Sequence, residues 1–225
     1  MRLFKLAAVV VLLGGAGAGA IRAGVPQAQG PGQSQTRPTS TPYAGDLSIF
    51  EYPDRDKKLQ IERVMDLLGI QQGKSVADIG AGSGWFTVRA ARRVGPEGTV
   101  YAEDINPKAI DFIDTRASKQ RLGNVKTVLG TPDDPKLAPA SVDAVLLLKV
   151  YHEIAHPTEV MQRVRTTLRP GAKVGIIDRN GNGTDHGLDR EVVEKEMRGA
   201  GYKLSGRYDF TKADGEDYFL IFTAR

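Results

Sequence analysis

The sequence predicts an α/β fold with a mainly parallel sheet and helices on both faces. From Lys58 to the C-terminus, apolar strand patterns alternate with amphipathic helical patterns, and this alternation is typical of strands joined by crossover helices. Residues 142–148 are almost wholly apolar, as expected for a central strand covered on both sides. A run of alternating glycines at 80–84 separates a strand pattern from a helical pattern. Such a strand–loop–helix unit commonly binds a ligand at the carboxyl end of the strand.

The first expected elements lie between Leu59 and Gly123. Apolar spacing predicts a helix from about Leu59 to Gly69, followed by a strand at 75–79, a helix at 85–94 and a strand at 99–104. Asn106 and Pro107 predict the start of the next helix, because Asn caps a helix well and Pro suits its first position. We expect that helix to end near Gly123.

The second half of the chain continues the alternation. Strands are expected at 125–129, 142–148 and 173–178, and helices at 157–168 and 189–200. Pro170-Gly171 is expected to stop the first of these helices, and Gly201 lies just beyond the second. The last two strand patterns, at 202–208 and 218–223, predict an antiparallel hairpin.

Three regions are expected along the chain. Residues 1–23 resemble a signal peptide, with a basic start, a short apolar run and an A-x-A-like site at Ala18-Gly19-Ala20; an uncleaved membrane anchor is the alternative. Residues 24–45 are rich in Gln, Pro, Gly, Ser and Thr and are interpreted as a flexible linker. Residues 46–225 form the predicted domain, which we expect to be exported. The aromatic and acidic stretch 43–52 is expected to form a lid or an arm.

Composition excludes several classes of function. The chain has no cysteine, so it cannot form disulfides, thiolate zinc sites or a cysteine nucleophile. Its formal charge is +4, and cleavage of the leader at Ala18-Gly19-Ala20 would remove Arg2 and Lys5, leaving about +2. With no basic cluster interleaved with aromatic residues, we expect no nucleic-acid partner. Contact with a membrane is expected only if the leader stays attached, and the oligomeric state is left open.

The glycine loop is the strongest indication of a binding site. Gly80, Gly82 and Gly84 are spaced G-x-G-x-G, so the loop is a poor match to the G-x-G-x-x-G dinucleotide fingerprint and lacks the Gly-Lys-Ser/Thr of a P-loop. Glycine lets the backbone turn sharply and lets a ligand lie against it. Asp78 stands at the mouth of the loop and would suit a ligand with a cationic or hydroxyl-rich part. A tight turn without a ligand is the alternative.

Acidic residues follow the second and third strand patterns. Glu103-Asp104 ends the second strand, where a carboxylate can accept both hydroxyl protons of a ribose; we favour Asp104 because it directly precedes Ile105-Asn106-Pro107. In the loop 130–135, Asp133 or Asp134 is suited to an adenine amino group. A solvated turn explains that loop equally well.

Together these motifs resemble the class I S-adenosylmethionine-dependent methyltransferases. The resemblance rests on residues 76–86, 100–107, 141–146 and 168–174, and it covers roughly Gln60 to the C-terminus. It implies a Rossmann-like sheet of seven strands, mainly parallel, whose last strand is antiparallel. The loop at 130–135 and Tyr151-His152-Glu153 are similar to an exported bacterial branch of this superfamily.

The resemblance also implies the cofactor, S-adenosylmethionine, and residues that hold it. The glycine loop, with Gly80, Ala81, Gly82 and Gly84, would pack against its methionine part and ribose, and Asp78 would lie near its amino group. Asp104 and the adjacent Ile105 would hold the ribose side, and Asp133 or Asp134 the adenine.

Residues after the fourth strand are the candidates for catalysis. His152 is the best candidate base, since histidine titrates near neutral pH, and Glu153 or Tyr151 would orient it; a histidine that merely caps or packs a helix start is the alternative. His156 is interpreted as a surface or capping residue. The loop 180–187 would cover the acceptor, unless it is simply a disordered surface loop.

The resemblance also bears on metals and acceptors. Metal-dependent members place an acid where this chain has Lys149, so we expect no catalytic metal. Members that methylate arsenic use cysteines, which are absent here, and the Asn/Asp-Pro-Pro-aromatic motif of the enzymes that act on DNA amino groups is also missing.

We therefore expect a methyltransferase that acts on an O, N or C nucleophile, with a small molecule as the main candidate acceptor. Two alternatives remain open. An exported domain that binds an adenosyl ligand without turnover is favoured by the leader, because the cofactor is made in the cytoplasm. A nicotinamide-dependent oxidoreductase is disfavoured by the glycine spacing.

Overall fold

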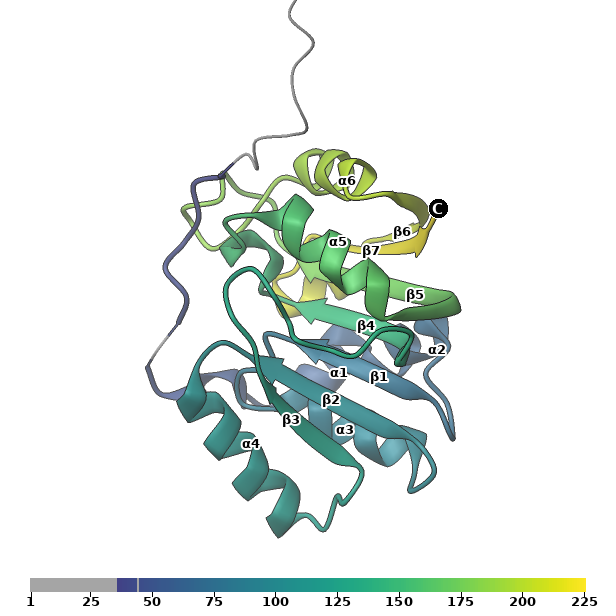
Figure 1. The fold of residues 1–225 in the computed structure, drawn as a ribbon. Helices are drawn as coiled ribbons and strands as arrows, with labels where there is room; N and C mark the ends of the chain where they lie inside the picture. Colours follow the sequence, from purple (N-terminus) through teal and green to yellow (C-terminus); the bar gives the residue numbers. More distant parts are fainter. Residues whose placement is uncertain (1–35, 44) are drawn as a thin grey trace, which may run out of the picture. The chain divides into compact units, whose positions relative to one another are not determined.

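A computed structural model describes residues 36–43 and 45–225 (Figure 1). The signal peptide predicted at 1–23 and most of the linker predicted at 24–45 lie outside these residues. No helix in the described ranges is both long and apolar enough to cross a bilayer.

Seven strands form one sheet in the order β3-β2-β1-β4-β5-β7-β6. They are β1 (Ser75–Ile79), β2 (Thr99–Asp104), β3 (Val125–Leu129), β4 (Val142–Leu148), β5 (Leu168–Asp178), β6 (Tyr202–Tyr208) and β7 (Tyr218–Ala224). The first five strands pair in parallel, and β7 runs antiparallel between β5 and β6. The predicted α/β class, the mainly parallel sheet and the C-terminal hairpin are thus confirmed.

Six α-helices and three short 3-10 helices accompany the sheet in the described ranges. They are η1 (Leu47–Phe50), α1 (Arg55–Leu59), α2 (Ile61–Leu68), α3 (Trp85–Val94), α4 (Pro107–Lys119), η2 (Tyr151–Glu153), α5 (Pro157–Thr167), α6 (Arg190–Gly199) and η3 (Phe210–Asp214). The helix expected from Leu59 to Gly69 is broken at Gln60, whose φ is 50°. A left-handed residue cannot continue a right-handed helix, so the segment divides into α1 and α2.

Two apolar clusters lie on opposite faces of the sheet. Residues of α5 and α6, among them Met161 and Met197, pack on one face. Residues of α1, α2 and α3, among them Leu59, Met65 and Phe86, pack on the other. Figure 1 shows α5 in front of the sheet and α1 and α3 behind it. Burial on both faces explains why β4 is apolar at nearly every position.

Two boundaries differ from the sequence prediction by several residues, the end of α4 and the start of β5. Asn106 Oδ1 accepts a hydrogen bond from the Lys108 N–H at 3.0 Å, as predicted for a helix cap, but α4 ends at Lys119, short of Gly123. Strand β5 begins at Leu168 and passes through Pro170-Gly171. Leu168 pairs with Val142 and Lys173 pairs with Ala144, so Pro170-Gly171 lies in an irregular, bulged part of β5 and does not interrupt the strand.

The order of strands decides where a ligand can bind. From β1 the chain moves outward to β2 and β3, and then returns to place β4 on the other side of β1. The helices that follow β1 and β4, which are α3 and α5, therefore lie on opposite faces of the sheet. This reversal of strand order is the usual position of a ligand crevice in open α/β sheets.

Candidate active site

A pocket lies at that edge of the sheet. The loops after β1, β2 and β4 line it, together with the segment that precedes α1. Its lining includes four of the predicted cofactor residues in β1 and the loop after it, Asp78, Gly80, Ala81 and Gly82, and two at the end of β2, Asp104 and Ile105. Gly84 is not among the lining residues; it stands at the N-cap of α3.

The glycine loop needs its glycines for two reasons. Gly80, Gly82 and Gly84 have φ values of 68°, 54° and 70°, a region that other residues occupy only with strain. A Cβ at Gly80 would also lie 2.4 Å from Cγ2 of Val150. The loop after β1 therefore packs directly on the loop after β4, and the two together form one wall of the pocket.

Both acids at the end of β2 bind the backbone of the glycine loop. Asp104 accepts hydrogen bonds from the N–H groups of Gly82 and Asn106, each at 2.8 Å. Glu103 accepts one from the N–H of Gly80 at 3.4 Å. Both carboxyl groups also line the pocket. A carboxylate has further lone pairs, so Asp104 can still accept the hydroxyl protons of a bound ribose.

Asp78 is 2% exposed and accepts a hydrogen bond from Oγ1 of Thr87 at 2.6 Å. Burial, together with the nearby charge of Asp104, raises the pKa of Asp78 to about 7 and that of Glu103 to about 8. Arg55, which also lines the pocket, opposes the rise at Asp78. Crowded acids of this kind favour a ligand that brings a positive charge and hydroxyl groups.

The two acids expected at the adenine do not line the pocket. Asp133 is paired with His156, whose Nδ1 lies 2.7 Å from its Oδ1, and Asp134 accepts a hydrogen bond from Arg163 at 3.2 Å. From the same loop, Thr131 and Pro135 line the pocket instead. The assignment of the adenine contact to Asp133 or Asp134 remains a prediction.

The segment before α1 forms a wall of the pocket that no sequence motif predicted. Tyr43, Leu47 and Phe50 line the pocket, and the rings of Tyr43 and Phe50 meet edge to face with centroids 5.5 Å apart. Glu51 ties this segment to the glycine loop, because it accepts a hydrogen bond from Oγ of Ser83 at 2.7 Å. The aromatic composition of 43–52 was the sequence signal for this contact.

On the acceptor side, η2 follows directly after β4. Glu153 lines the pocket, and burial raises its pKa to about 7. His152 is 4% exposed, and its Nε2 lies 3.8 Å from Oε1 of Glu153. Tyr151 is fully buried in the apolar cluster under α5 and is not among the pocket-lining residues. The structure thus places His152 beside Glu153, which lines the pocket, whereas neither His152 nor Tyr151 is among the lining residues.

The residue that orients His152 is one that the sequence analysis did not assign. Nδ1 of His152 lies 2.9 Å from both carboxylate oxygens of Asp178, the last residue of β5. Because a carboxylate only accepts hydrogen bonds, Nδ1 carries the imidazole proton. The lone pair of the neutral ring then lies on Nε2. The sequence signal was weak, since Asp178 is simply an acid at a strand end.

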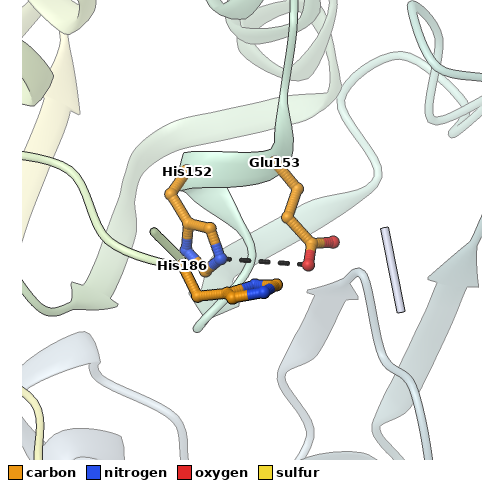
Figure 2. A group of neighbouring side chains, drawn as sticks. All are labelled: His152, Glu153 and His186. Carbon is orange, nitrogen blue, oxygen red and sulfur yellow. Dashed lines mark ion pairs between the residues drawn. The ribbon is translucent and has the colours of Figure 1, made fainter. Parts of the chain in front are cut away.

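Residues 179–188 form a loop that brings a second histidine to this place. In Figure 2, the side chain of His186 lies next to those of His152 and Glu153, and the two imidazole rings meet edge to face with centroids 5.9 Å apart. The backbone of His186 is held at both ends: its N–H donates to Oγ of Ser40 at 2.9 Å, and its carbonyl oxygen accepts from Arg179 at the same distance.

The described part of the expected linker also contacts the domain. Arg37 donates hydrogen bonds to the carbonyl oxygens of Tyr151, His152 and Ile154, at 2.8–3.1 Å, and forms an ion pair with Glu196 at 3.2 Å. Ser40 is buried. Residues 36–40 therefore form a strap over η2 and the loop that carries His186. The domain boundaries otherwise stay predictions.

The pocket is suited to S-adenosylmethionine. The backbone of Gly80 and Gly82 lines the pocket without a side chain, and acids surround the place where the positive charge and ribose hydroxyls of the cofactor would lie. Apolar side chains, including Phe50 and Ile105, offer surfaces for a flat base.

Comparisons with known proteins agree with this site. A family model described as "Methyltransferase domain" matches residues 70–205. A nocamycin O-methyltransferase from Saccharothrix syringae is 32% identical over 51% of this chain and 41% of its own length. An arsenite methyltransferase from Halobacterium salinarum is 32% identical over 47% of this chain and 27% of its own length. The chain thus spans less than half the length of either curated relative.

Among solved structures, a SAM-dependent methyltransferase from Aquifex aeolicus superposes with a TM-score of 0.72 at 20% identity, covering 81% of this chain and 100% of that one. A likeness at this identity shows the shared fold. The family model covers more than half of the chain, and its range includes the glycine loop and Asp104. The chain therefore belongs to the methyltransferase domain family of the class I superfamily, whose cofactor is S-adenosylmethionine.

Proposed function

We propose that this methyltransferase transfers the methyl group to an oxygen, nitrogen or carbon nucleophile of a small molecule. The observation that carries this proposal is the continuity of one pocket. Asp78, Gly80 and Asp104, which belong to the proposed cofactor side, and Glu153 and Ile154, which follow β4, all line this one pocket. An acceptor bound between Val150 and Glu153 would lie beside the methyl group of the cofactor.

The chemistry requires mainly alignment. The sulfonium is an activated electrophile, so holding the nucleophile, the methyl carbon and the sulfur in line supplies much of the rate enhancement. A protonated nucleophile must also lose its proton. Glu153 at the pocket and His152 behind it are the groups placed to draw that proton away.

Two features favour a small acceptor. The segment with Tyr43, Leu47 and Phe50 covers part of the pocket, which leaves less room for a folded macromolecule at the methyl group. One of the relatives is named for an O-methylation, which supports oxygen among the candidate nucleophiles. Export remains part of the proposal because residues 1–23 have the pattern of a signal peptide.

Two measurements test the proposal. Calorimetry should show binding of S-adenosylmethionine and of its demethylated product, and both should raise the melting temperature. Incubation with methyl-labelled cofactor should then label a small-molecule extract and leave a protein fraction unlabelled. Labelling of protein alone would refute the small acceptor, and binding without any transfer would favour the adenosyl-binding domain.

A further inference from the structure

Three side chains at the acceptor end present metal-ligand atoms to one another. An imidazole nitrogen of His152, an imidazole nitrogen of His186 and a carboxylate oxygen of Glu153 all lie within 4.8 Å of one another (Figure 2). In a tetrahedral site with bonds of about 2.0–2.1 Å, neighbouring ligand atoms are roughly 3.4 Å apart. Nε2 of His152 and Oε1 of Glu153 are already 3.8 Å apart, so a small rotation of the exposed His186 side chain would complete the set.

The hydrogen bonding of the two ring nitrogens of His152 is a second and independent observation. Its Nε2 is buried and has no hydrogen-bond partner among the described residues, and a buried polar atom without a partner is costly. Nδ1 of the same ring is held by Asp178 at 2.9 Å. Histidines that bind metals almost always give their other ring nitrogen to a carboxylate or carbonyl in this way, which fixes the tautomer.

The position of His186 is also fixed, although its side chain is exposed. Its φ of 60° is uncommon for a residue other than glycine. Ser40 and Arg179 hold its backbone on either side, and Gly183 closes the loop by donating to the carbonyl oxygen of Gly187 at 2.7 Å. The loop therefore directs an imidazole toward η2 in a backbone conformation that is itself strained.

From this geometry we propose that His152, Glu153 and His186 bind one divalent transition-metal ion of the zinc type at the acceptor end of the pocket. Two imidazoles and one carboxylate suit Zn²⁺, Fe²⁺ or Co²⁺ rather than Mg²⁺ or Ca²⁺, which prefer oxygen ligands. Three protein ligands leave a coordination position open.

The other three-residue cluster in the described ranges is less suited to a metal. Asp133, His156 and Glu159 also bring ligand atoms together, but both ring nitrogens of His156 are already occupied. Nδ1 lies 2.7 Å from Asp133 and Nε2 lies 3.0 Å from Oγ1 of Thr36. His152 instead has one nitrogen oriented by Asp178 and the other free.

The expectation of no metal rested on Lys149, which stands where metal-dependent members have an acid. Lys149 is occupied by an ion pair with the buried Glu216 at 2.6 Å. The ligand set lies three and four residues farther on, and it includes a histidine from a different loop.

The consequence for catalysis rests on the proposed function, whereas metal binding does not. An open position beside the pocket would take an acceptor oxygen, such as a hydroxyl or carboxylate, and lower the pKa of a bound hydroxyl. His152 and Glu153 would then assist loss of the acceptor proton as metal ligands.

Metal titration tests the proposal directly. The full chain, without a histidine tag and stripped with a chelator, should bind one Zn²⁺ per chain in calorimetry, and Co²⁺ should give visible absorption bands of a tetrahedral or five-coordinate site. His186→Gln and Glu153→Gln should each weaken Zn²⁺ binding at least tenfold. The matched control His156→Gln should leave binding unchanged. Binding of S-adenosylmethionine should be unaffected in His186→Gln, whose side chain is exposed.

Two results would overturn the metal site. They are Zn²⁺ binding no tighter than millimolar, and Zn²⁺ binding that His186→Gln leaves unchanged, whether or not His156→Gln abolishes it. Because cofactor binding is measured separately, each result leaves the assignment as a methyltransferase standing. Conversely, Zn²⁺ binding without methyl transfer would remove the proposed function and keep the site.

Discussion

Asp178 and His152 form a buried pair in which one carboxylate reaches a single imidazole nitrogen at 2.9 Å through both of its oxygens. The pair joins the end of β5 to the short helix after β4. Its effect is to leave Nε2 of His152 facing Glu153 and His186.

Asp178→Asn should therefore lower the methyl-transfer rate and Zn²⁺ affinity at least tenfold each. An amide can donate as well as accept, so it no longer fixes the proton on Nδ1. The affinity for S-adenosylmethionine should stay the same, because Asp178 does not line the pocket. Asp217→Asn is the control, since Asp217 lies at the same sheet edge and binds the N–H of Asn180 at 2.8 Å. Equal rates in both variants would contradict the positioning role.

Asp104→Ala should weaken binding of the cofactor by roughly 1–3 kcal/mol, because it removes a charged hydrogen-bond acceptor from the ribose side of the pocket. It also removes the bond to the Gly82 N–H. Calorimetry with the demethylated product measures the change. Asp111→Ala, at an exposed position of α4, should bind as the wild type does. An unchanged dissociation constant in Asp104→Ala would mean that another residue holds the ribose.

Gly80→Ala should abolish cofactor binding. It should also lower the free energy of unfolding by more than the cost of placing alanine at a positive φ. Its Cβ would meet Val150 at 2.4 Å. Gly69 offers a matched control, because its φ is 74° and nothing lies within 4 Å of its Cβ. Gly69→Ala should cost about 1 kcal/mol, measured by denaturant unfolding. If the two variants unfold alike, the close contact between the two loops is wrong.

Binding of the cofactor should release protons near neutral pH. Burial raises the pKa of Asp78 to about 7, and a cation placed beside it would lower that pKa again. Affinity should therefore rise from pH 6 to pH 8, and calorimetry in buffers of different ionisation enthalpy should detect the released proton. Asp78→Asn should reduce both effects. Thr87, Asp104 and Arg55 surround Asp78 and remain in the variant.

The same acids predict how the ligand-free protein responds to pH. The pKa values of Asp78 and Glu103 in the folded state lie above those of free carboxyl groups, so the folded state holds protons that the unfolded state releases. Their contribution to stability is complete below about pH 4 and is lost as pH rises through about 7 and 8. Each group gives a slope of about 1.4 kcal/mol per pH unit in that window. Melting curves of Asp78→Asn should show a flatter pH dependence than the wild type, and an equal slope would show that Asp78 is already ionised.

Arg37→Ala should destabilise the domain by about 2–4 kcal/mol, because three carbonyl oxygens around η2 lose their donor and Glu196 loses its partner. Arg163→Ala is the control. Its side chain is 48% exposed, and its loss should change stability by no more than about 0.5 kcal/mol. A similar small change in Arg37→Ala would show that the strap contributes nothing to the fold.

Local patterns were sufficient for most of the fold. The strand at 75–79, the helix at 85–94 and the cap at Asn106 depend on residues adjacent in sequence, and all were predicted correctly. The break at Gln60 was missed because nothing in its neighbours requires a positive φ. Pro170-Gly171 stops a helix locally, but whether it also fits a strand depends on the register of β4.

The candidate site also has parts that local sequence predicted and parts that depend on contacts with distant residues. The glycine loop and the acid after β2 were predicted at the pocket, because each follows a strand at a fixed distance and parallel strands end at one edge. Asp133 and Asp134 also follow a strand, β3, yet their partners are His156 and Arg163. The choice between pocket and surface is made by side chains from elsewhere in the chain.

The sequence by itself determined the succession of strands and helices along the chain, the family, and the residues at the cofactor side of the pocket. These features come from short-range backbone preferences, local motifs and hydrophobic periodicity. Only the tertiary structure decided that Asp178 and His186 meet His152, and that Ser40, 146 residues away, fixes the backbone of His186. Such meetings depend on how loops pack across the edge of the sheet. No local propensity specifies that packing, since its free energy comes from contacts between residues far apart in the chain.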